Sequence, residues 1–371
     1  MSRKSRQVKI GGFDHVEAII LGGGLPPVVQ TMWKDRLTYH DLQGDAASSL
    51  LARVGQLKKL GCGLLRFAVP DLASAEILGN LASMVSMPLV ADIHFDYKIA
   101  LRCLDFPIAK IRINPGNIGS RDKVEAVLTK AAHNSRPIRI GVNGGSLPKN
   151  ILKRVDEGSL DSAEALVMAA EQELAIFDEF KFNDVLVSIK ASSIADTIRA
   201  NRIFAERYDI PLHIGLTEAG PLIAGLVRST AALLDLLADG IGDTLRVSLS
   251  DNMEKEIIAA REILKAAGLT AAGLPANGIQ IVSCPKCGRS SFDTHGFTER
   301  WQSRLYAMDK NINVAVMGCE VNGPGEASHA DLGITGAGNK VLIFSKGKVV
   351  RTVEAAEADA AFEEELERVE N

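Results

Sequence analysis

The chain has 371 residues, of which 46% are hydrophobic and 24% are charged. This composition is typical of a globular protein and excludes a largely disordered chain. The formal net charge of −4 offers no basic field for a nucleic acid backbone. No apolar run approaches the ~18 residues of a membrane span. Because one hydrophobic core rarely exceeds ~250–300 residues, we expect two domains.

The N-terminus and the cysteines indicate the compartment. The first six residues are basic and lack the apolar stretch of a secretory signal, so we expect a solvated tail on a cytoplasmic protein. Five cysteines are an odd number, which fits a disulfide framework poorly. Two of them form a C-x-x-C pair, which indicates metal or redox chemistry in a reducing compartment.

Short β-branched segments alternate with helical segments over the first two thirds of the chain. We predict eight strands at 28–31, 64–69, 89–94, 109–114, 138–143, 185–190, 212–218 and 244–249. Helical periodicity is clearest at 46–60, 162–177 and 253–266. Eight such units predict an α/β TIM (β/α)₈ barrel. An open doubly wound sheet is the alternative, but the glycine triplet at 22–24 precedes the first strand instead of following it.

A composition change separates this region from the rest of the chain. Small and flexible residues at 269–278 predict a linker, which gives a barrel at 1–268 and a smaller α+β domain at 279–371. In the smaller domain we predict strands at 279–283, 314–317, 341–344 and 349–353, followed by a charged helix at 356–369.

Polar side chains end every predicted barrel strand, and a barrel brings strand ends to one rim. Five of them are cations, namely Arg66, Arg112, Arg139, Lys190 and Arg246. The other rim candidates are Asp92, His94, Asn143, His213, Thr217, Glu218 and Ser248. The loop that contains Asn117 can present backbone N–H groups to an anion. Converging cations require an anion, and phosphate or diphosphate is the natural ligand because guanidinium groups bind it bidentately.

Each rim residue also has an ordinary interpretation. One arginine can simply pair with Asp92 or Glu218, and His213 can be a satisfied core histidine. Lys190, surrounded by cations, would also suit a Schiff base, so an aldolase or transferase acting on sugar phosphates is the alternative enzyme.

The smaller domain carries Cys284 and Cys287 on one turn, and Cys319 after another strand. Zinc takes four ligands, and His295 or His329 could complete such a site, so a zinc-ribbon binding module is the non-enzymatic alternative. A 4Fe-4S cluster on three cysteines leaves one iron for another ligand. Glu326 is a candidate because a carboxylate is a hard ligand and is displaced more easily than thiolate.

Eight motifs, in chain order, resemble one known family. They read ADIHFDY from residue 91, RINPGNIG from 112, RIGVN from 139, SIKAS from 188, LTEAG from 216, GDTLRVS from 242, CPKCGR from 284 and NGPGE from 322. They are similar to the 4-hydroxy-3-methylbut-2-enyl diphosphate synthase family, and the resemblance runs from about residue 28 to 338. One difference is a bulky Trp33 where the family has small polar residues, which we expect to alter one wall of the pocket.

The resemblance implies reductive ring opening and dehydroxylation of 2-C-methyl-D-erythritol 2,4-cyclodiphosphate, on the methylerythritol phosphate route to isoprenoid precursors. It implies a 4Fe-4S cluster held by Cys284, Cys287, Cys319 and Glu326. The matching cations of the mouth, which would bind the cyclic diphosphate, are Arg66, Arg112, Arg139 and Lys190.

The resemblance also assigns roles and partners. Glu218 matches a carboxylate that donates a proton or holds the substrate, and Asn322 is expected to approach the cluster-side face. Our own hypothesis is that a substrate oxygen reaches the iron that Glu326 vacates and that Glu218 assists protonation. Ferredoxin or flavodoxin is the expected electron donor. A head-to-tail homodimer is implied, in which the cluster domain of one chain caps the barrel of the other.

Overall fold

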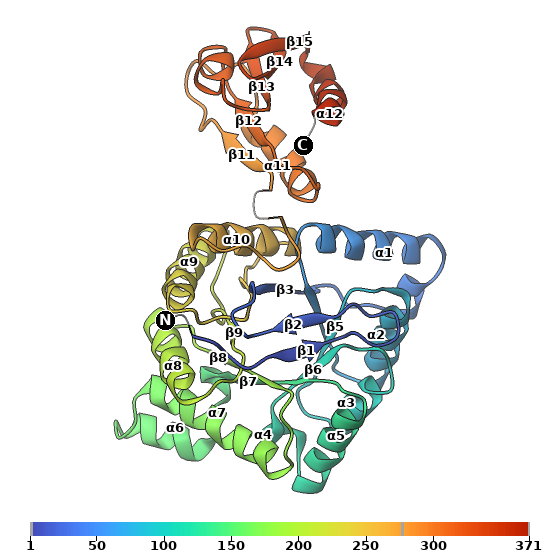
Figure 1. Ribbon diagram of the computed structural model, residues 1–371, viewed down its shortest axis with the longest axis vertical. Helices are drawn as coiled ribbons and strands as arrows, with labels where there is room; N and C mark the ends of the chain where they lie inside the picture. The colour runs from blue at the N-terminus through green and yellow to red at the C-terminus, as the bar shows by residue number, and fades with distance from the viewer. Residues whose placement is uncertain (1–2, 276–277, 370–371) are drawn as a thin grey trace. The chain divides into compact units, whose positions relative to one another are not determined.

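The computed structural model describes residues 3–275 and 278–369. The chain forms two compact units, Met1–Gly273 and Leu274–Asn371 (Figure 1). The boundary lies inside the segment 269–278, for which we predicted a linker; residues 276 and 277 of that segment lie outside the described residues. No helix in the described ranges is long and apolar enough to cross a membrane.

The first unit is a barrel of eight parallel strands. These are β3 (Val28–Met32), β4 (Leu64–Ala68), β5 (Leu89–Asp92), β6 (Lys110–Ile113), β7 (Ile138–Asn143), β8 (Val185–Lys190), β9 (His213–Ile214) and β10 (Thr244–Leu245). Their order is β8-β7-β6-β5-β4-β3-β10-β9. A parallel bridge between Val187 and Leu212 joins the two ends of this order and closes the barrel. The TIM-barrel prediction is confirmed, and the open sheet was the wrong alternative.

Two strands are much shorter than the sequence predicted. The predicted strands at 212–218 and 244–249 retain only the two-residue β9 and β10. After β9 the chain turns, and Glu218 has a φ of +53°, a conformation that strands do not adopt. Thr217, Glu218 and Ser248 therefore lie on loops beyond the strand ends.

Helices surround the barrel, as Figure 1 shows. They are η1 (Tyr39–Leu42), α1 (Gly44–Lys59), α2 (Leu72–Met84), α3 (Tyr97–Cys103), α4 (Pro115–Ile118), α5 (Arg121–His133), η2 (Gly144–Ser146), α6 (Lys149–Asp156), α7 (Ser162–Glu179), α8 (Ile194–Arg207), α9 (Leu222–Ala238) and α10 (Met253–Ala266). Side-chain caps fix several starts: Asp71 accepts a hydrogen bond from the N–H of Ser74, and Asn252 from that of Lys255. These caps set the angle at which α2 and α10 leave the rim.

An N-terminal hairpin closes the other end of the barrel. Strands β1 (Val8–Ile10) and β2 (Ile19–Leu21) pair antiparallel and were not predicted. Their buried side chains pack against the first residues of the barrel strands, including Val28 and Leu64. Ahead of them, Arg3 donates hydrogen bonds to the carbonyls of Tyr208 and Ile210. The prediction of a solvated tail is therefore wrong from Arg3 onward.

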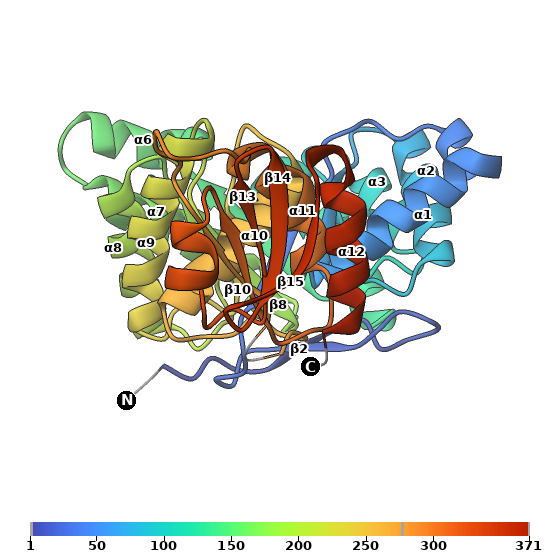
Figure 2. The same ribbon diagram turned by 90° about the horizontal axis from the view of Figure 1, so that it is seen from above.

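The second unit is a five-stranded sheet with two helices. Its elements are β11 (Gln280–Ser283), α11 (Thr294–Tyr306), β12 (Asn313–Met317), the π-helix η3 (Val321–Glu326), β13 (Leu332–Ala337), β14 (Lys340–Ser345), β15 (Lys348–Glu354), η4 (Ala355–Glu357) and α12 (Ala358–Arg368). The first three strands are parallel and the last two pairings are antiparallel. β13 and α11 were missed by the sequence analysis. Figure 2 shows this sheet with α12 alongside it.

The two faces of this sheet differ. Phe297 and Trp301 of α11 and Phe362 of α12 pack on the face that carries Val314 and Val316. The opposite face carries Ala315, Met317 and Phe344 together with Ala327 and Ala330, and Cys284 packs against this second group. The large aromatic core therefore lies on the face away from Cys284.

The hairpin makes the first testable prediction. Ile10 is fully buried in it, so Ile10→Ala removes apolar contact and leaves a cavity that costs about 2–5 kcal/mol of unfolding free energy. Ile20, on the same hairpin, is 47% exposed, and Ile20→Ala is the matched control with a small effect. Urea denaturation followed by circular dichroism measures both; equal stability losses would show that the hairpin does not close the core.

Candidate active site

A cavity of about 350 Å³ lies at the carboxyl ends of the barrel strands, and we call it the mouth cavity. Its wall contains all five predicted cations and six further predicted residues. The lining residues are Met32, Arg66, Asp92, His94, Arg112, Arg139, Gly141, Val142, Asn143, Ser188, Lys190, Leu216, Thr217, Glu218, Arg246 and Ser248. Side chains that are far apart in the sequence thus meet at one rim, as the barrel rule requires.

Asp92 is the carboxylate around which the cations are arranged. Its Oδ1 accepts a hydrogen bond from Arg112 Nη1 at 3.3 Å, and its Oδ2 lies 3.7 Å from both Arg66 Nε and His94 Nε2. Burial alone would raise the pKa of Asp92. The hydrogen bond with His94 and the charges of Arg66 and Arg112 outweigh burial and hold this pKa below its ordinary value. Asp92 is therefore an anion that fixes two arginines.

The cavity carries more positive charge than its own acids neutralise. Five cations face two carboxylates, Asp92 and Glu218, in its wall. Arg139 is only 1% exposed, and its Nε and Nη1 have no hydrogen-bond partner among the described residues. Burial, and then the charges of Arg139 and Arg246, hold the pKa of Lys190 well below its ordinary value. Such an arrangement favours an anionic ligand.

Glu256 on α10 holds one of these cations and was missed by the sequence analysis. Its carboxylate accepts hydrogen bonds from Thr31 Oγ1 at 2.7 Å, from the N–H of Leu249 at 3.0 Å, and from Arg246 Nε and Nη2, both at 3.2 Å. Lys34 Nζ lies 3.0 Å away. The sequence did contain a signal for the burial of Glu256, because this residue stands at helical spacing among the apolar residues of α10, next to Ile257.

Glu173 on α7 holds the loop after β6 by a hydrogen bond to its backbone. Its side chain is buried, and its Oε2 accepts a hydrogen bond from the N–H of Gly116 at 2.9 Å. Burial raises the pKa of Glu173, and the Gly116 hydrogen bond only partly opposes this. Gly116 has no room for a side chain, since a Cβ there would lie 2.6 Å from Glu173 Oε1. The glycine thus permits this contact between the loop and the helix.

Two of the predicted contacts, His213 and Asn117, are not in the wall of the mouth cavity. His213 is fully buried, and its Nδ1 lies 2.6 Å from Thr244 Oγ1. It is the first residue of β9, whereas Thr217 lies beyond the end of this strand. Asn117 is exposed on the short helix α4 and does not line the cavity.

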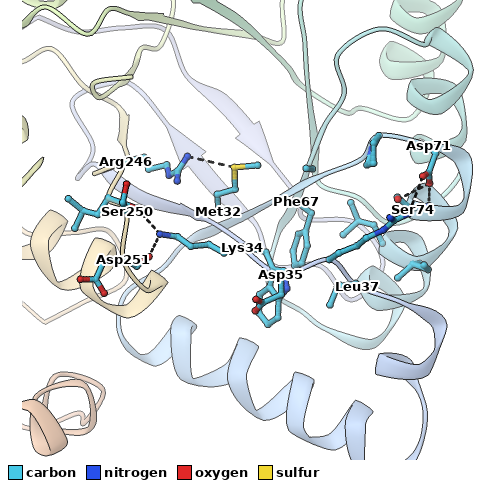
Figure 3. A pocket seen from close by; sticks show the side chains of 17 residues that line it. Met32, Lys34, Asp35, Leu37, Phe67, Asp71, Ser74, Arg246, Ser250 and Asp251 are labelled. Carbon is cyan, nitrogen blue, oxygen red and sulfur yellow. Dashed lines mark hydrogen bonds and ion pairs between the residues drawn. The ribbon is translucent and has the colours of Figure 1, made fainter. Parts of the chain in front are cut away.

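A larger pocket of about 1000 Å³ adjoins the mouth cavity and shares Met32 and Arg246 with it. Figure 3 shows Lys34 reaching the segment of Ser250 and Asp251, while Phe67 stands on the other side. Trp33 lines this pocket, stacks on Phe67 with ring centroids 5.5 Å apart, and lies under the guanidinium of Arg53. The unusual Trp33 therefore shapes this neighbouring pocket and does not line the mouth cavity.

The cysteines of the second unit lie after neighbouring parallel strands. Ser283 pairs with Val316 in the β11–β12 register, so Cys284 and Cys319 follow adjacent strand ends. The N–H of Ser291 donates to the carbonyl of Gly318 at 2.9 Å, which joins the Cys287 turn to the Cys319 segment. The N–H and the charge of Arg289 lower the pKa of the exposed Cys287 thiol, which favours the thiolate that metals bind.

The donor chemistry of these cysteines suits an iron–sulfur cluster. Three soft sulfur donors come from two loops that are hydrogen-bonded to each other. Among the described side chains, no group of three or more cysteine, histidine, aspartate or glutamate residues is gathered closely enough to hold a metal ion. The side chains of Asn322 and Glu326 lie outside the described part, although their backbone forms η3.

Glu256 gives the second prediction. Glu256→Ala leaves Arg246 buried without its partner and is expected to cost about 3–5 kcal/mol of unfolding free energy. The folded-state pKa of Glu256 lies below the ordinary 4.5, so this contribution is present above pH 4.5 and is lost as the pH falls through the lower value. Chemical denaturation of the variant and the wild type at several pH values measures it. The neighbouring Glu254→Gln is the control, and a difference that grew on acidification would contradict the assignment.

Comparisons with known proteins agree on one family. The model of the GcpE TIM-barrel domain matches residues 6–261, and that of the GcpE protein C-terminal domain matches residues 280–368. Proteins named 4-hydroxy-3-methylbut-2-en-1-yl diphosphate synthase (flavodoxin) from Treponema pallidum and Geobacter sulfurreducens are 51% and 42% identical to this chain. They cover 98% and 100% of it, and 91% and 99% of their own lengths align. A solved dihydropteroate synthase from Xanthomonas albilineans is similar at a TM-score of 0.45 and 14% identity, over 73% of this chain and 100% of that one. The chain belongs to the GcpE family of 4-hydroxy-3-methylbut-2-en-1-yl diphosphate synthases.

Proposed function

We propose that this enzyme converts 2-C-methyl-D-erythritol 2,4-cyclodiphosphate to 4-hydroxy-3-methylbut-2-enyl diphosphate. The reaction consumes two electrons and two protons, opens the ring and releases one water. The observation that supports this substrate most is the mouth cavity, where five cations face two carboxylates. A cyclic diphosphate supplies the missing negative charge and presents many oxygens to guanidinium donors.

The arginines bind and orient the diphosphate in this proposal. Arg112 is held from two sides, since Nη1 donates to Asp92 and Nη2 donates to the carbonyl of Gly141 at 3.0 Å. Arg246 is held by Glu256, and two nitrogen atoms of Arg139, which have no partner among the described residues, are available for the ligand's oxygens. A cation that is fixed before the ligand arrives loses little conformational entropy on binding.

Glu218 is the proton donor of the proposal. It lies on the loop after β9, in the cavity wall and beyond the strand end, where it faces the ligand and not the barrel interior. Its role is to protonate the hydroxyl oxygen that leaves as water. The left-handed backbone at Glu218 presents the side chain from a turn, which a strand conformation would not do.

Cys284, Cys287, Cys319 and Glu326 would hold a 4Fe-4S cluster, which supplies electrons and a Lewis-acidic iron when it is bound. Flavodoxin is the proposed electron donor because the names of the relatives include it. Ferredoxin is the second candidate donor. We further propose a cytoplasmic head-to-tail homodimer, as the family resemblance implies.

The cluster makes the third prediction. Protein purified without oxygen is expected to contain about four irons and four acid-labile sulfides per chain, with a broad visible absorption band. Cys319→Ser is expected to lose most of this band, whereas Cys103→Ala, at a buried thiol in the other unit, keeps it. Stoichiometric zinc without sulfide, after attempted reconstitution, would overturn the proposed function in favour of a zinc-binding module.

Glu218 makes the fourth prediction. Glu218→Gln is expected to preserve binding of the cyclic diphosphate and to lower kcat by about 10²–10⁴-fold, since the amide cannot donate the proton. Turnover with a chemical reductant and direct binding of the substrate separate the two effects. The exposed Glu206→Gln, on α8, is the control. An unchanged kcat in Glu218→Gln would remove this residue from the proton transfer.

A further inference from the structure

A lysine is buried beneath the mouth cavity, and the function proposed above does not use it. Lys110 is the first residue of β6 and is 0% exposed. Its Nζ has no hydrogen-bond partner among the described residues. Since side chains alternate along a strand, Lys110 shares a face of β6 with Arg112, two residues further on. Arg112 lines the mouth cavity and Lys110 does not, so Lys110 lies one layer deeper.

The floor of the mouth cavity and the layer beneath it are polar and poorly paired. Arg139 has two unpartnered nitrogen atoms, His213 has an unpartnered Nε2, and both amide atoms of Gln30 lack partners within the described ranges. Each of these three side chains is at most 1% exposed. Buried polar atoms without partners are rare in folded proteins and usually indicate function. Lys110 and His213 are the titratable side chains among these residues that do not line the mouth cavity, and Lys110 is the one that shares its strand with Arg112.

The charges around Lys110 are mostly positive. The charged and titratable groups on or directly after the surrounding strands are Arg66 on β4, Asp92 on β5, Arg112 on β6, Arg139 on β7, Lys190 on β8, His213 on β9 and Arg246 after β10. Asp92 is the one acid among them, and it is already shared by Arg66 and Arg112. An arginine cannot release its proton in a protein, but a lysine can. Burial, followed by the charges of Arg139 and Arg66, holds the pKa of Lys110 well below its ordinary value.

An anion in the mouth cavity reverses this balance. A diphosphate on Arg139 places two or more negative charges above Lys110 and compensates the arginines that oppose an ammonium group there. We propose that Lys110 is a positioning residue of the anion site that takes up a proton when a diphosphate binds and adds a cation beneath Arg139. This inference rests on the proposed function, because it requires the mouth cavity to bind that anion. The step adds one proton from solvent to the Lys110 amine and changes no other bond.

Lys190 is the other lysine of the barrel interior, but it differs in one respect. Lys190 lines the mouth cavity and meets the ligand directly. Lys110 is separated from the ligand by the wall, so replacing it alters the local charge without removing a direct contact. If a Lys110 variant takes up fewer protons on binding, the missing proton is therefore attributed to Lys110 and not to a lost contact with the ligand.

Isothermal titration calorimetry counts this proton. The probe is inorganic pyrophosphate, titrated into the full-length protein at about pH 8 in buffers of different ionisation enthalpy. Lys110→Met and Lys110→Arg are compared with the wild type, and Lys59→Met, at an exposed lysine at the end of α1, is the control. Pyrophosphate changes its own protonation equally in every protein. The difference in proton count between two proteins therefore measures the protons that the protein itself takes up.

We expect both Lys110 variants to take up close to one proton fewer than the wild type and the control. Lys110→Met is expected to bind pyrophosphate about tenfold more weakly at neutral pH, because one unit charge near the anion is missing. Lys110→Arg keeps a permanent charge and is expected to keep the affinity. The ratio of the wild-type affinity for pyrophosphate to that of Lys110→Arg is expected to fall as the pH rises. Because one proton is involved, this ratio can change by at most tenfold per pH unit.

Two failures are distinguishable. Equal proton counts in the wild type and a folded Lys110 variant would overturn this inference and leave the anion site intact. A wild-type protein that binds no pyrophosphate would overturn the anion site itself, and this inference with it. Circular dichroism confirms folding; Lys110→Arg retains the long polar side chain and carries the test if the methionine variant does not fold.

Discussion

Repulsion among like charges inside the barrel is the constraint on which the rest of this structure depends. Five cations line one small cavity, and further basic groups lie beneath it. The chain tolerates this through fixed partners: Asp92 holds Arg66 and Arg112, and Glu256 holds Arg246. What remains unpaired lowers the stability of the empty barrel. The same unpaired charge is available to bind an anion, so ligand binding stabilises the fold.

The apolar parts of the barrel make this polar interior possible. The hairpin of β1 and β2 covers the amino ends of the strands with Val8, Ile10 and Leu21. Low access to water strengthens the repulsion among the buried cations, and it equally strengthens their attraction for a ligand that enters. The apolar closure at one end of the barrel thus increases the electrostatic effect of the cations at the other end.

The sequence predicted the rim well because one geometric rule connects distant positions. Parallel strands end on the same side, so Arg66, Arg139 and Lys190 could be placed together without knowing any contact. The rule does not apply to His213, because this residue stands at the start of β9 and not at its carboxyl end. Lys110 was overlooked because it begins its strand, where no rim residue is expected.

Residues supplied by helices were harder to predict, for a different reason. Glu256 and Glu173 are acids on helices that also carry polar surfaces, and only the orientation of each helix shows that these acids are buried. The hairpin was missed because a three-residue strand is too short to show a clear alternation of polar and apolar residues. Long strands follow from pattern alone, whereas short strands and buried helix acids depend on contacts that the sequence does not state.

Both candidate sites use the same topological feature. In the barrel the cations follow the ends of parallel strands, and in the second unit Cys284 and Cys319 follow the ends of the parallel strands β11 and β12. The second unit adds an asymmetry, because α11 and α12 cover the sheet face that carries the aromatic core. Cys284 packs with the small residues Ala327 and Ala330 on the opposite face. The cysteine-bearing loops therefore lie apart from the aromatic core that stabilises the unit.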